Sequence, residues 1–221
     1  MKILIVDDKV LFSESLKISL ENKSNNYNIT TVNKKEEFRE RIKADYYNLI
    51  ILSMEFYYQS EKNGLYIAKM IKQMISDTKI ILLTYKNKYM YLKKSKELNI
   101  DGYIDISLGV DEFIRVIDQI VLKNEKVLKN ELFINGKSVT VDSSYKHSLL
   151  TKKEIQVLYL LYNSEQIDII ASKLYISPRT VNNHINQIYK KLNVSNRQEA
   201  MLKAYELGYI EYGYEEGLLQ K

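Results

Sequence analysis

ISPRTVNNHINQIYKKL, residues Ile176–Leu192, is the stretch that predicts most about the fold. Ser177 followed by Pro178 is typical of a helix start, because serine caps free N–H groups and proline suits the first helical position. The apolar residues that follow recur at helical spacing: Val181, Ile185, Ile188 and Leu192. We therefore predict a helix whose apolar stripe packs on a neighbouring helix.

The opposite face of this helix carries amides and cations but no carboxylate. Its side chains are Arg179, Asn182, Asn183, Asn186, Gln187 and Lys190. A solvated helix face usually mixes both signs of charge, whereas base edges and phosphates favour amides and cations. Asparagine and glutamine can form two hydrogen bonds with adenine in the major groove. The pattern predicts DNA binding, and an ordinary polar surface is the alternative.

Further helices are predicted around this one. Thr151 to Glu154 has the pattern of a capping box, and Gln166–Leu174 is amphipathic. Ser195–Gln198 predicts a second capping box for a last helix, which should stop at Gly208. Between Lys173 and Lys203 the sequence has six basic residues and one acid, an excess that attracts a phosphate backbone or simply forms a solvated face.

The first 122 residues alternate short β-branched runs with amphipathic stretches. The predicted strands are Ile3–Val6, Asn28–Val32, Leu49–Leu52, Lys79–Leu83 and Gly102–Ile104. The predicted helices are Leu11–Leu20, Lys35–Ala44, Gly64–Ile75, Lys86–Leu98 and Val110–Leu122. Five such units in series favour a parallel α/β sheet with helices on both faces, and its working site should lie at the carboxyl ends of the strands.

Residues 123–148 break the pattern because they are lysine-rich and polar. Asn135-Gly136 between β-branched residues predicts a small hairpin there. We expect one domain at 1–122, a linker at 123–148 and a small all-α domain of four helices at 149–221.

Composition excludes several kinds of site. The chain has no cysteine and two histidines, which excludes disulfides, thiolate sites and histidine-rich zinc sites. No apolar run approaches the length of a membrane span, and Asp7-Asp8 follows the apolar start too closely for a secretory signal, so we expect a cytoplasmic protein. No phosphate-binding loop, nucleophile elbow or metal-ligand cluster is present, so we expect no enzymatic activity, no catalytic or metal site and no cofactor.

The C-terminal residues resemble the LuxR-type helix-turn-helix. The resemblance lies in residues 150–158, 170–185 and 188–192, in Asn196-Arg197 and in Ala200. It implies double-stranded DNA as the partner, with base reading by Asn182, Asn183 and Asn186. It also implies phosphate contacts by Ser177, Arg179, Thr180, Lys190, Lys191 and Arg197. The family often has lysine where Asn182 stands, so the expected readout shifts from guanine toward adenine.

The same resemblance implies that the last helix pairs two subunits, which would meet two half-sites of a near-palindrome. The residues expected in this homodimer surface are Ala200, Met201, Ala204 and Tyr205. The alternative is that they close the core of their own domain.

The first 122 residues resemble the receiver domain of two-component response regulators, so the whole chain resembles the NarL/FixJ group. The likeness rests on Asp7-Asp8, Asn63-Gly64, Thr84 and Gly102-Tyr103. It implies a CheY- or flavodoxin-like, doubly wound sheet of five strands. In that family two acids hold Mg²⁺, an aspartate after the third strand accepts a phosphoryl group, and a lysine after the fifth strand contacts it.

Two parts of that chemistry are missing. Ser53 stands at the position of the acceptor aspartate and Ile106 at the position of the lysine. Serine is a weak nucleophile without an adjacent base, and Mg²⁺ affinity should fall with one carboxylate fewer. The segment from Ser53 to Gly64 is longer than usual, and Tyr85 replaces a usual small residue, which predicts a blocked pocket mouth.

We therefore hypothesise a pseudo-receiver that works without aspartyl phosphate. Its degenerate pocket is expected to contain Asp7, Asp8, Ser53, Thr84, Tyr103 and Ile106. Thr84 and Tyr103 resemble the family's switch pair, although ordinary packing explains them equally well. One alternative keeps phosphorylation through another acceptor such as Glu55, which would make a sensor kinase a partner. A second alternative is a protein-interaction adaptor that does not bind DNA.

Overall fold

The computed structural model describes residues 1–24, 26–56, 64–85, 89–128, 150–163 and 165–210, and the backbone of two strands at 131–134 and 137–140. The chain divides into two compact units, one built from residues 1–87 and 92–129 and the other from 88–91 and 130–221. Each unit contains a hydrophobic cluster of its own.

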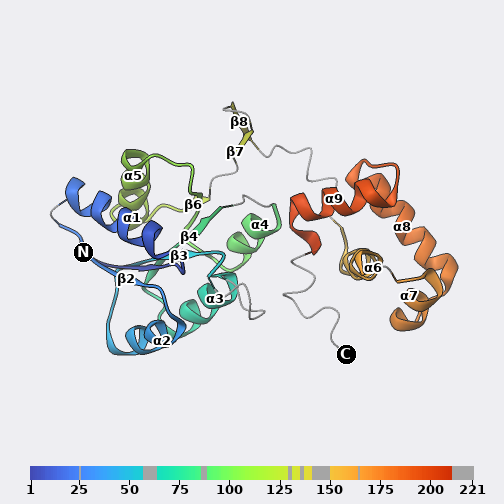
Figure 1. The fold of residues 1–221 in the computed structure, drawn as a ribbon, viewed down its shortest axis with the longest axis horizontal. Coiled ribbons are helices and arrows are strands. Elements are labelled where there is room, and N and C mark those ends of the chain that lie inside the picture. The colour runs from blue at the N-terminus through green and yellow to red at the C-terminus, as the bar shows by residue number, and fades with distance from the viewer. Residues whose placement is uncertain are drawn as a thin grey trace. The chain divides into compact units, whose positions relative to one another are not determined.

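The first unit is a parallel sheet with helices on both faces (Figure 1). Its strand order is β2-β1-β3-β4-β5-β6, and every neighbouring pair is parallel. The strands are β1 Lys2–Val6, β2 Asn28–Val32, β3 Leu49–Ser53, β4 Lys79–Thr84, β5 Gly102–Asp105 and β6 Val127–Leu128. The helices are α1 Val10–Lys23, α2 Lys35–Ala44, α3 Gly64–Met74, α4 Tyr89–Glu97 and α5 Val110–Val121.

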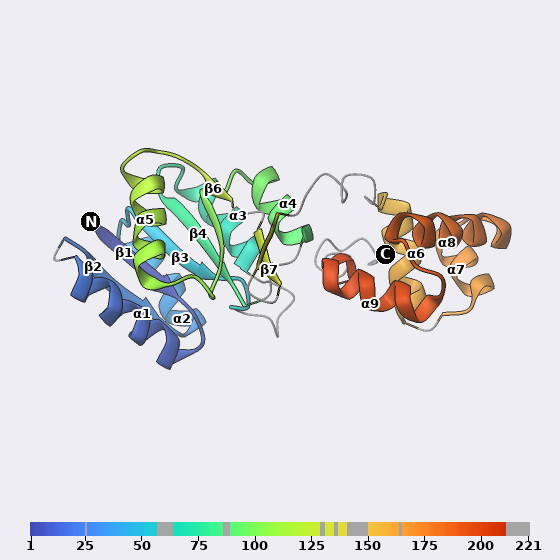
Figure 2. The ribbon, with the colours of Figure 1, turned by 90° about the horizontal axis from the view of Figure 1, so that it is seen from above.

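The two faces of the sheet are covered by different helices. Alternate residues of a strand point to opposite faces, and Ile3 and Ile5 of β1 join Phe113 and Ile117 of α5 in one cluster. Figure 2 shows α1 and α5 on this face, and Figure 1 shows α2 and α3 on the other. The doubly wound fold is thus confirmed.

The sheet has one strand more than we predicted. β6 pairs with β5, with Val127 opposite Gly102, inside the segment expected to be linker. Two residues are too short a run to show periodicity in a sequence. The predicted loop between Ser53 and Gly64 lies partly outside the described residues, but its end is closely packed. A Cβ on Gly64 would lie 2.5 Å from the carbonyl oxygen of Ser53, so only glycine fits where α3 begins.

The second unit contains the four predicted helices, α6 Lys152–Tyr162, α7 Ile167–Leu174, α8 Pro178–Leu192 and α9 Arg197–Leu207. It also holds an antiparallel pair, β7 Glu131–Ile134 and β8 Lys137–Thr140, which confirms the predicted hairpin. The turn residues Asn135 and Gly136 lie outside the described residues. α8 packs against α6, α7 and α9 and so forms the centre of the unit.

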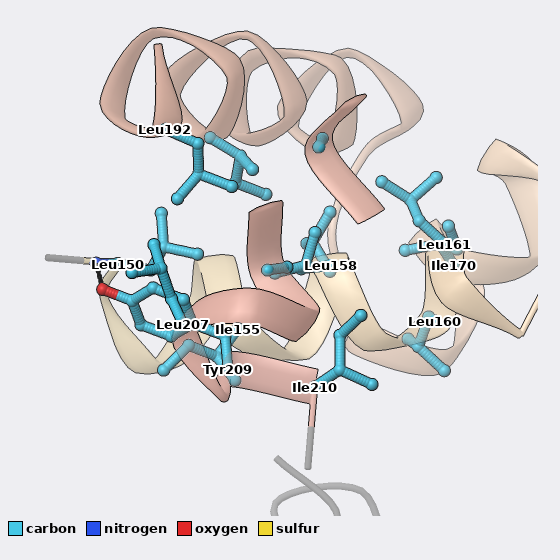
Figure 3. Packing of buried hydrophobic residues seen from close by; sticks show 14 of the residues in the cluster. Leu150, Ile155, Leu158, Leu160, Leu161, Ile170, Leu192, Leu207, Tyr209 and Ile210 are labelled. Atoms are coloured by element: carbon cyan, nitrogen blue, oxygen red, sulfur yellow. Dashed lines mark hydrogen bonds between the residues drawn. The ribbon is translucent and has the colours of Figure 1, made fainter. Parts of the chain in front are cut away.

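The core of this unit joins residues far apart in the sequence. Figure 3 shows the hydroxyl of Tyr209 directed at the backbone of Leu150, whose N–H donates to it at 3.4 Å. Burial raises the pKa of Tyr209 to about 12, so its hydroxyl stays protonated at neutral pH. This contact joins the chain entering α6 to the chain leaving α9.

The helix ends follow the predicted capping residues in three cases out of four. Thr151 and Glu154 form the capping box, Ser177 caps α8, and Gly208 ends α9 with φ of 81°. The prediction for Ser195 was wrong. Asn196 caps α9, because its side-chain oxygen accepts from the N–H of Glu199 at 2.9 Å.

Candidate nucleic-acid interface and degenerate pocket

The turn between α7 and α8 is held by local backbone geometry. α7 ends at Tyr175 in the left-handed conformation, with φ of 54° and ψ of 46°. Two residues later, the Ser177 hydroxyl accepts from the N–H of Thr180 at 3.1 Å. Three residues therefore separate two packed helices, which is the length of the turn in a helix-turn-helix.

The two faces of α8 divide as the sequence predicts. Val181, Ile188 and Leu192 are buried, and Ile185 packs against the same cluster. The six residues of the acid-free face are all exposed: Arg179, Asn182, Asn183, Asn186, Gln187 and Lys190. At about 100° per residue they span an arc of roughly 140°. All three predicted base-reading asparagines are therefore accessible on one side of a well-packed helix.

Arg179 and Lys190 give this face its positive charge. Neither forms an ion pair with a carboxylate within the described residues. Lys173 of α7, in contrast, is paired with Glu165. The predicted phosphate residues Ser177 and Thr180 lie at the start of α8, where N–H groups and the helix dipole favour an anion.

Lys191, one of the predicted phosphate contacts, forms an ion pair within its own unit. Its ammonium lies 2.7 Å from a carboxylate oxygen of Glu154, which is 4% exposed. Burial alone would raise the pKa of Glu154, but the hydrogen bonds from Lys191 and from the N–H of Thr151 lower it overall. Lys191 thus joins α8 to α6. The sequence missed this pair because the two residues lie 37 positions apart.

Arg197 also has a structural partner, since its guanidinium donates to the carbonyl oxygen of Leu161 at the end of α6. Residue 197 is nonetheless exposed at the first turn of α9. A guanidinium has five N–H donors, so this bond leaves others for a phosphate.

The predicted dimer surface needs a correction. Ala200 and Ala204 are fully buried in the core of their own unit, and half-buried Met201 packs against it. Tyr205 is 40% exposed, and Leu202, which was not among the predicted dimer residues, is 63% exposed. The outward apolar surface of α9 is therefore formed by Leu202 and Tyr205.

In the first unit, the carboxyl end of β1 is closed by Tyr85. The Asp7 carboxylate is 1% exposed and accepts from the N–H of Lys9 at 2.8 Å and from the Tyr85 hydroxyl at 3.1 Å. The Lys9 ammonium lies 4.0 Å from the centre of the Tyr85 ring. Burial raises the pKa of Asp7 and of Tyr85. Tyr85 covers the buried acid, as its size predicted, whereas Asp8 is exposed.

Glu55 lies between the ends of β3 and β4. Its carboxylate accepts from the Ser53 hydroxyl at 3.4 Å, the Thr84 hydroxyl at 3.5 Å and the N–H of Tyr85 at 3.3 Å. Burial raises its pKa. The hydroxyl at the acceptor position thus faces a carboxylate of the same chain.

The other two predicted pocket residues, Tyr103 and Ile106, lie within β5 and directly after it. Tyr103 is 1% exposed within β5, which fits the packing alternative. Ile106 packs against the cluster under α1 and α5, and its N–H donates to the carbonyl oxygen of Thr84.

These residues do not fit Mg²⁺. The ion needs near-octahedral oxygen ligands, and both oxygens of Asp7 already accept hydrogen bonds. Ser53 supplies no carboxylate, and the described part of the chain contains no cluster of three acidic, histidine or cysteine side chains arranged to hold a metal.

Asp7→Asn is expected to stabilise the first unit at neutral pH. Burial raises the folded-state pKa of Asp7, so ionising this carboxyl lowers stability as pH rises above its unfolded value. The amide of the variant can keep hydrogen bonds to both the N–H of Lys9 and the hydroxyl of Tyr85. Thermal unfolding should show a higher midpoint for the variant at pH 7, and the gain should vanish below about pH 4. Asp8→Asn, at an exposed position, is the control. A lower midpoint for Asp7→Asn at pH 7 would contradict this account.

Two family models match the chain. "Response regulator receiver domain" matches residues 3–118, and "Bacterial regulatory proteins, luxR family" matches residues 148–204. Among the described helices, each is too short or too polar to cross a bilayer.

Two relatives match this chain along nearly their whole length. The transcriptional regulatory protein YdfI of Bacillus subtilis is 29% identical, over 95% of this chain and 97% of the relative. The regulator ComA of the same species is 26% identical, over 95% and 99%. A solved complex of the two-component response regulator RcsB with DNA has a TM-score of 0.68 at 20% identity and covers 94% of this chain and 98% of that one, which shows likeness of fold.

Proposed function

The chain belongs to the response regulators that join a receiver domain to a luxR-type domain, a family of DNA-binding transcription regulators, and we propose that this member acts without an aspartyl phosphate. In this proposal residues 149–221 bind DNA and residues 1–122, with β6, form a pseudo-receiver. The rest of the segment 123–148 links them.

The acid-free face of α8 carries the DNA-binding part of the proposal. Asn182, Asn183 and Asn186 present amide groups that match adenine edges in the major groove. Ser177, Thr180, Arg179 and Lys190 surround them as phosphate contacts, and Arg197 adds a fifth basic or polar group on a neighbouring helix. Phosphate contacts fix the register, whereas the asparagines read the sequence.

Selection of duplexes from a random pool tests this part directly. We expect the full chain to enrich A·T-containing sites, with an affinity that falls steeply as salt rises. Recovery of no duplex at low salt would favour the adaptor alternative, which does not bind DNA.

The dimer expected on DNA would pair through the revised surface of α9, Leu202 and Tyr205. Exposed apolar groups at this spacing on one helix suit a symmetric contact with a second copy. Leu202→Glu should then weaken binding to a two-half-site duplex more than binding to a single half-site.

Phosphate independence is supported by what fills the pocket. The Tyr85 hydroxyl donates to Asp7, the hydroxyls of Ser53 and Thr84 donate to Glu55, and the side chain of Ile106 has no donor for a phosphoryl oxygen. Glu55 is an unsuitable acceptor because it already accepts from three donors and burial disfavours its charged form.

Beryllofluoride with Mg²⁺ tests this second part. We expect no change in the oligomeric state or the DNA affinity of the chain, because Ser53 offers no carboxylate at the acceptor position to hold the complex. Ser53→Asp combined with Ile106→Lys and Tyr85→Ala is the comparison variant, in which the missing groups are restored and the cover removed. A beryllofluoride response of the unaltered chain would overturn phosphate independence and leave the DNA-binding proposal intact.

A further inference from the structure

A cavity of about 210 Å³ opens in the first unit between α1 and α5, beside the end of β4. Its walls are mostly apolar and include Phe12 and Leu16 of α1, Phe113 of α5 and Ile106. Phe12, Leu16 and Ile106 are only partly buried, so the cavity reaches solvent. Neither Asp7 nor Glu55 is among the residues that line it.

Ile106 explains why the cavity is apolar. A lysine at this position would place an ammonium beside Asp105, whereas the isoleucine side chain packs into the wall. Because Ile106 stands where a lysine would supply a positive charge, the cavity has an apolar wall with the carboxylate of Asp105 at its edge.

Asp105 sets the chemistry of a ligand. It is the one charged side chain among the residues that line the cavity. One of its carboxylate oxygens accepts from the N–H of Ser107 at 2.8 Å, and the other has no partner within the described residues. The serines Ser15 and Ser19 of α1 add two hydroxyl groups to the lining. An apolar cavity with one carboxylate at its edge is complementary to an apolar body that carries one positive charge.

The volume limits the size of that body. An apolar cavity of about 150 Å³ accommodates benzene, so one of about 210 Å³ suits a single ring with a short arm. Larger ring systems would have to extend into solvent.

We propose that this cavity is a binding site for a small primary amine with an aromatic or alicyclic ring, held with its ring between Phe12 and Phe113 and its ammonium on Asp105. The site gives the pseudo-receiver a chemical input. Phe12 also contacts Tyr85, with ring centres 5.7 Å apart, and Tyr85 bonds to Asp7. A ligand that contacts Phe12 therefore contacts the side chain that packs against Tyr85, and Tyr85 covers the buried carboxylate of Asp7.

Titration of the full chain with 2-phenylethylamine, followed by the methyl signals of Leu83, Ile106 and Leu108, tests the proposal. We expect saturable shifts of these methyl groups. The anion 3-phenylpropionate, which has a similar body, should cause none. Asp105→Asn keeps an acceptor for the N–H of Ser107 and removes the charge, so it should weaken amine binding about fivefold or more. Ser19→Phe fills the cavity and should abolish binding.

Three results would overturn the proposal. Shifts that the acid produces as strongly as the amine would remove the role of Asp105, and shifts that survive both variants would place the binding elsewhere. Methyl signals that move on dilution but not on addition of the amine would show that a second copy covers the cavity. If Ser19→Phe does not fold, Asp105→Asn alone decides, because its change conserves shape.

Discussion

Asn183→Ala is expected to weaken binding to the selected duplex about 10- to 100-fold, while binding to an unrelated duplex stays unchanged. A side-chain amide that forms two hydrogen bonds with one adenine contributes roughly 1–3 kcal/mol of discrimination. Asn183 lies near the middle of the exposed arc of α8, about one helical turn from both Arg179 and Asn186. Fluorescence anisotropy titrations with both duplexes at one salt concentration measure the difference.

Asn193→Gly provides the matched control for Asn183→Ala. Asn193 is also an exposed asparagine of the same segment, but it ends α8 in the left-handed conformation, with φ of 54°. Glycine accepts that conformation, so the fold should persist and the affinity should not change. Equal losses for the two duplexes with Asn183→Ala would contradict a base-reading role and would indicate a general contact instead.

Local pattern predicted the elements of this fold well. The strands at 28–32 and 49–52 and the helix at 35–44 were found within one residue of the expected bounds, because each run has a clear period and polar ends. The acid-free face of α8 was also visible, since it depends on helical spacing alone. β6 and the cap at Asn196 were missed, because a two-residue strand has no period and two adjacent polar residues compete for one cap.

The sequence alone did not predict which residues contact one another in the folded units. Ala200 and Ala204 sit on the same helix as Leu202 and Tyr205, and nothing local says which pair faces the core. Alanines allow two helices to approach closely, which made Ala200 and Ala204 candidates for a contact between subunits. In the structure they pack instead in the core of their own unit. Similarly, Lys9 and Tyr85 meet only because parallel strands bring their carboxyl ends together.

Lys191→Met is expected to lower the free energy of unfolding of the second unit by about 3 kcal/mol at neutral pH. Removing one partner of a buried ion pair leaves the other charge uncompensated, at a cost of about 3–5 kcal/mol, and partial exposure of the Lys191 side chain places the loss at the lower end. Lys191 holds the pKa of Glu154 below its usual value, so the pair contributes stability above the unfolded pKa of Glu154 and loses it as pH falls through the folded pKa. The difference between variant and unaltered chain should therefore shrink in acid.

Lys190→Met is the control for this prediction, because it deletes the same charge one residue away on the exposed face of α8. We expect it to leave unfolding unchanged, to weaken binding to all duplexes alike and to reduce the salt slope by about one. Urea unfolding followed by the amide signals of α8, together with salt titrations of DNA affinity, separates the two lysines. If Lys191→Met folds as stably as the unaltered chain and lowers the salt slope instead, then Lys191 contacts phosphate and its bond to Glu154 contributes little to the fold.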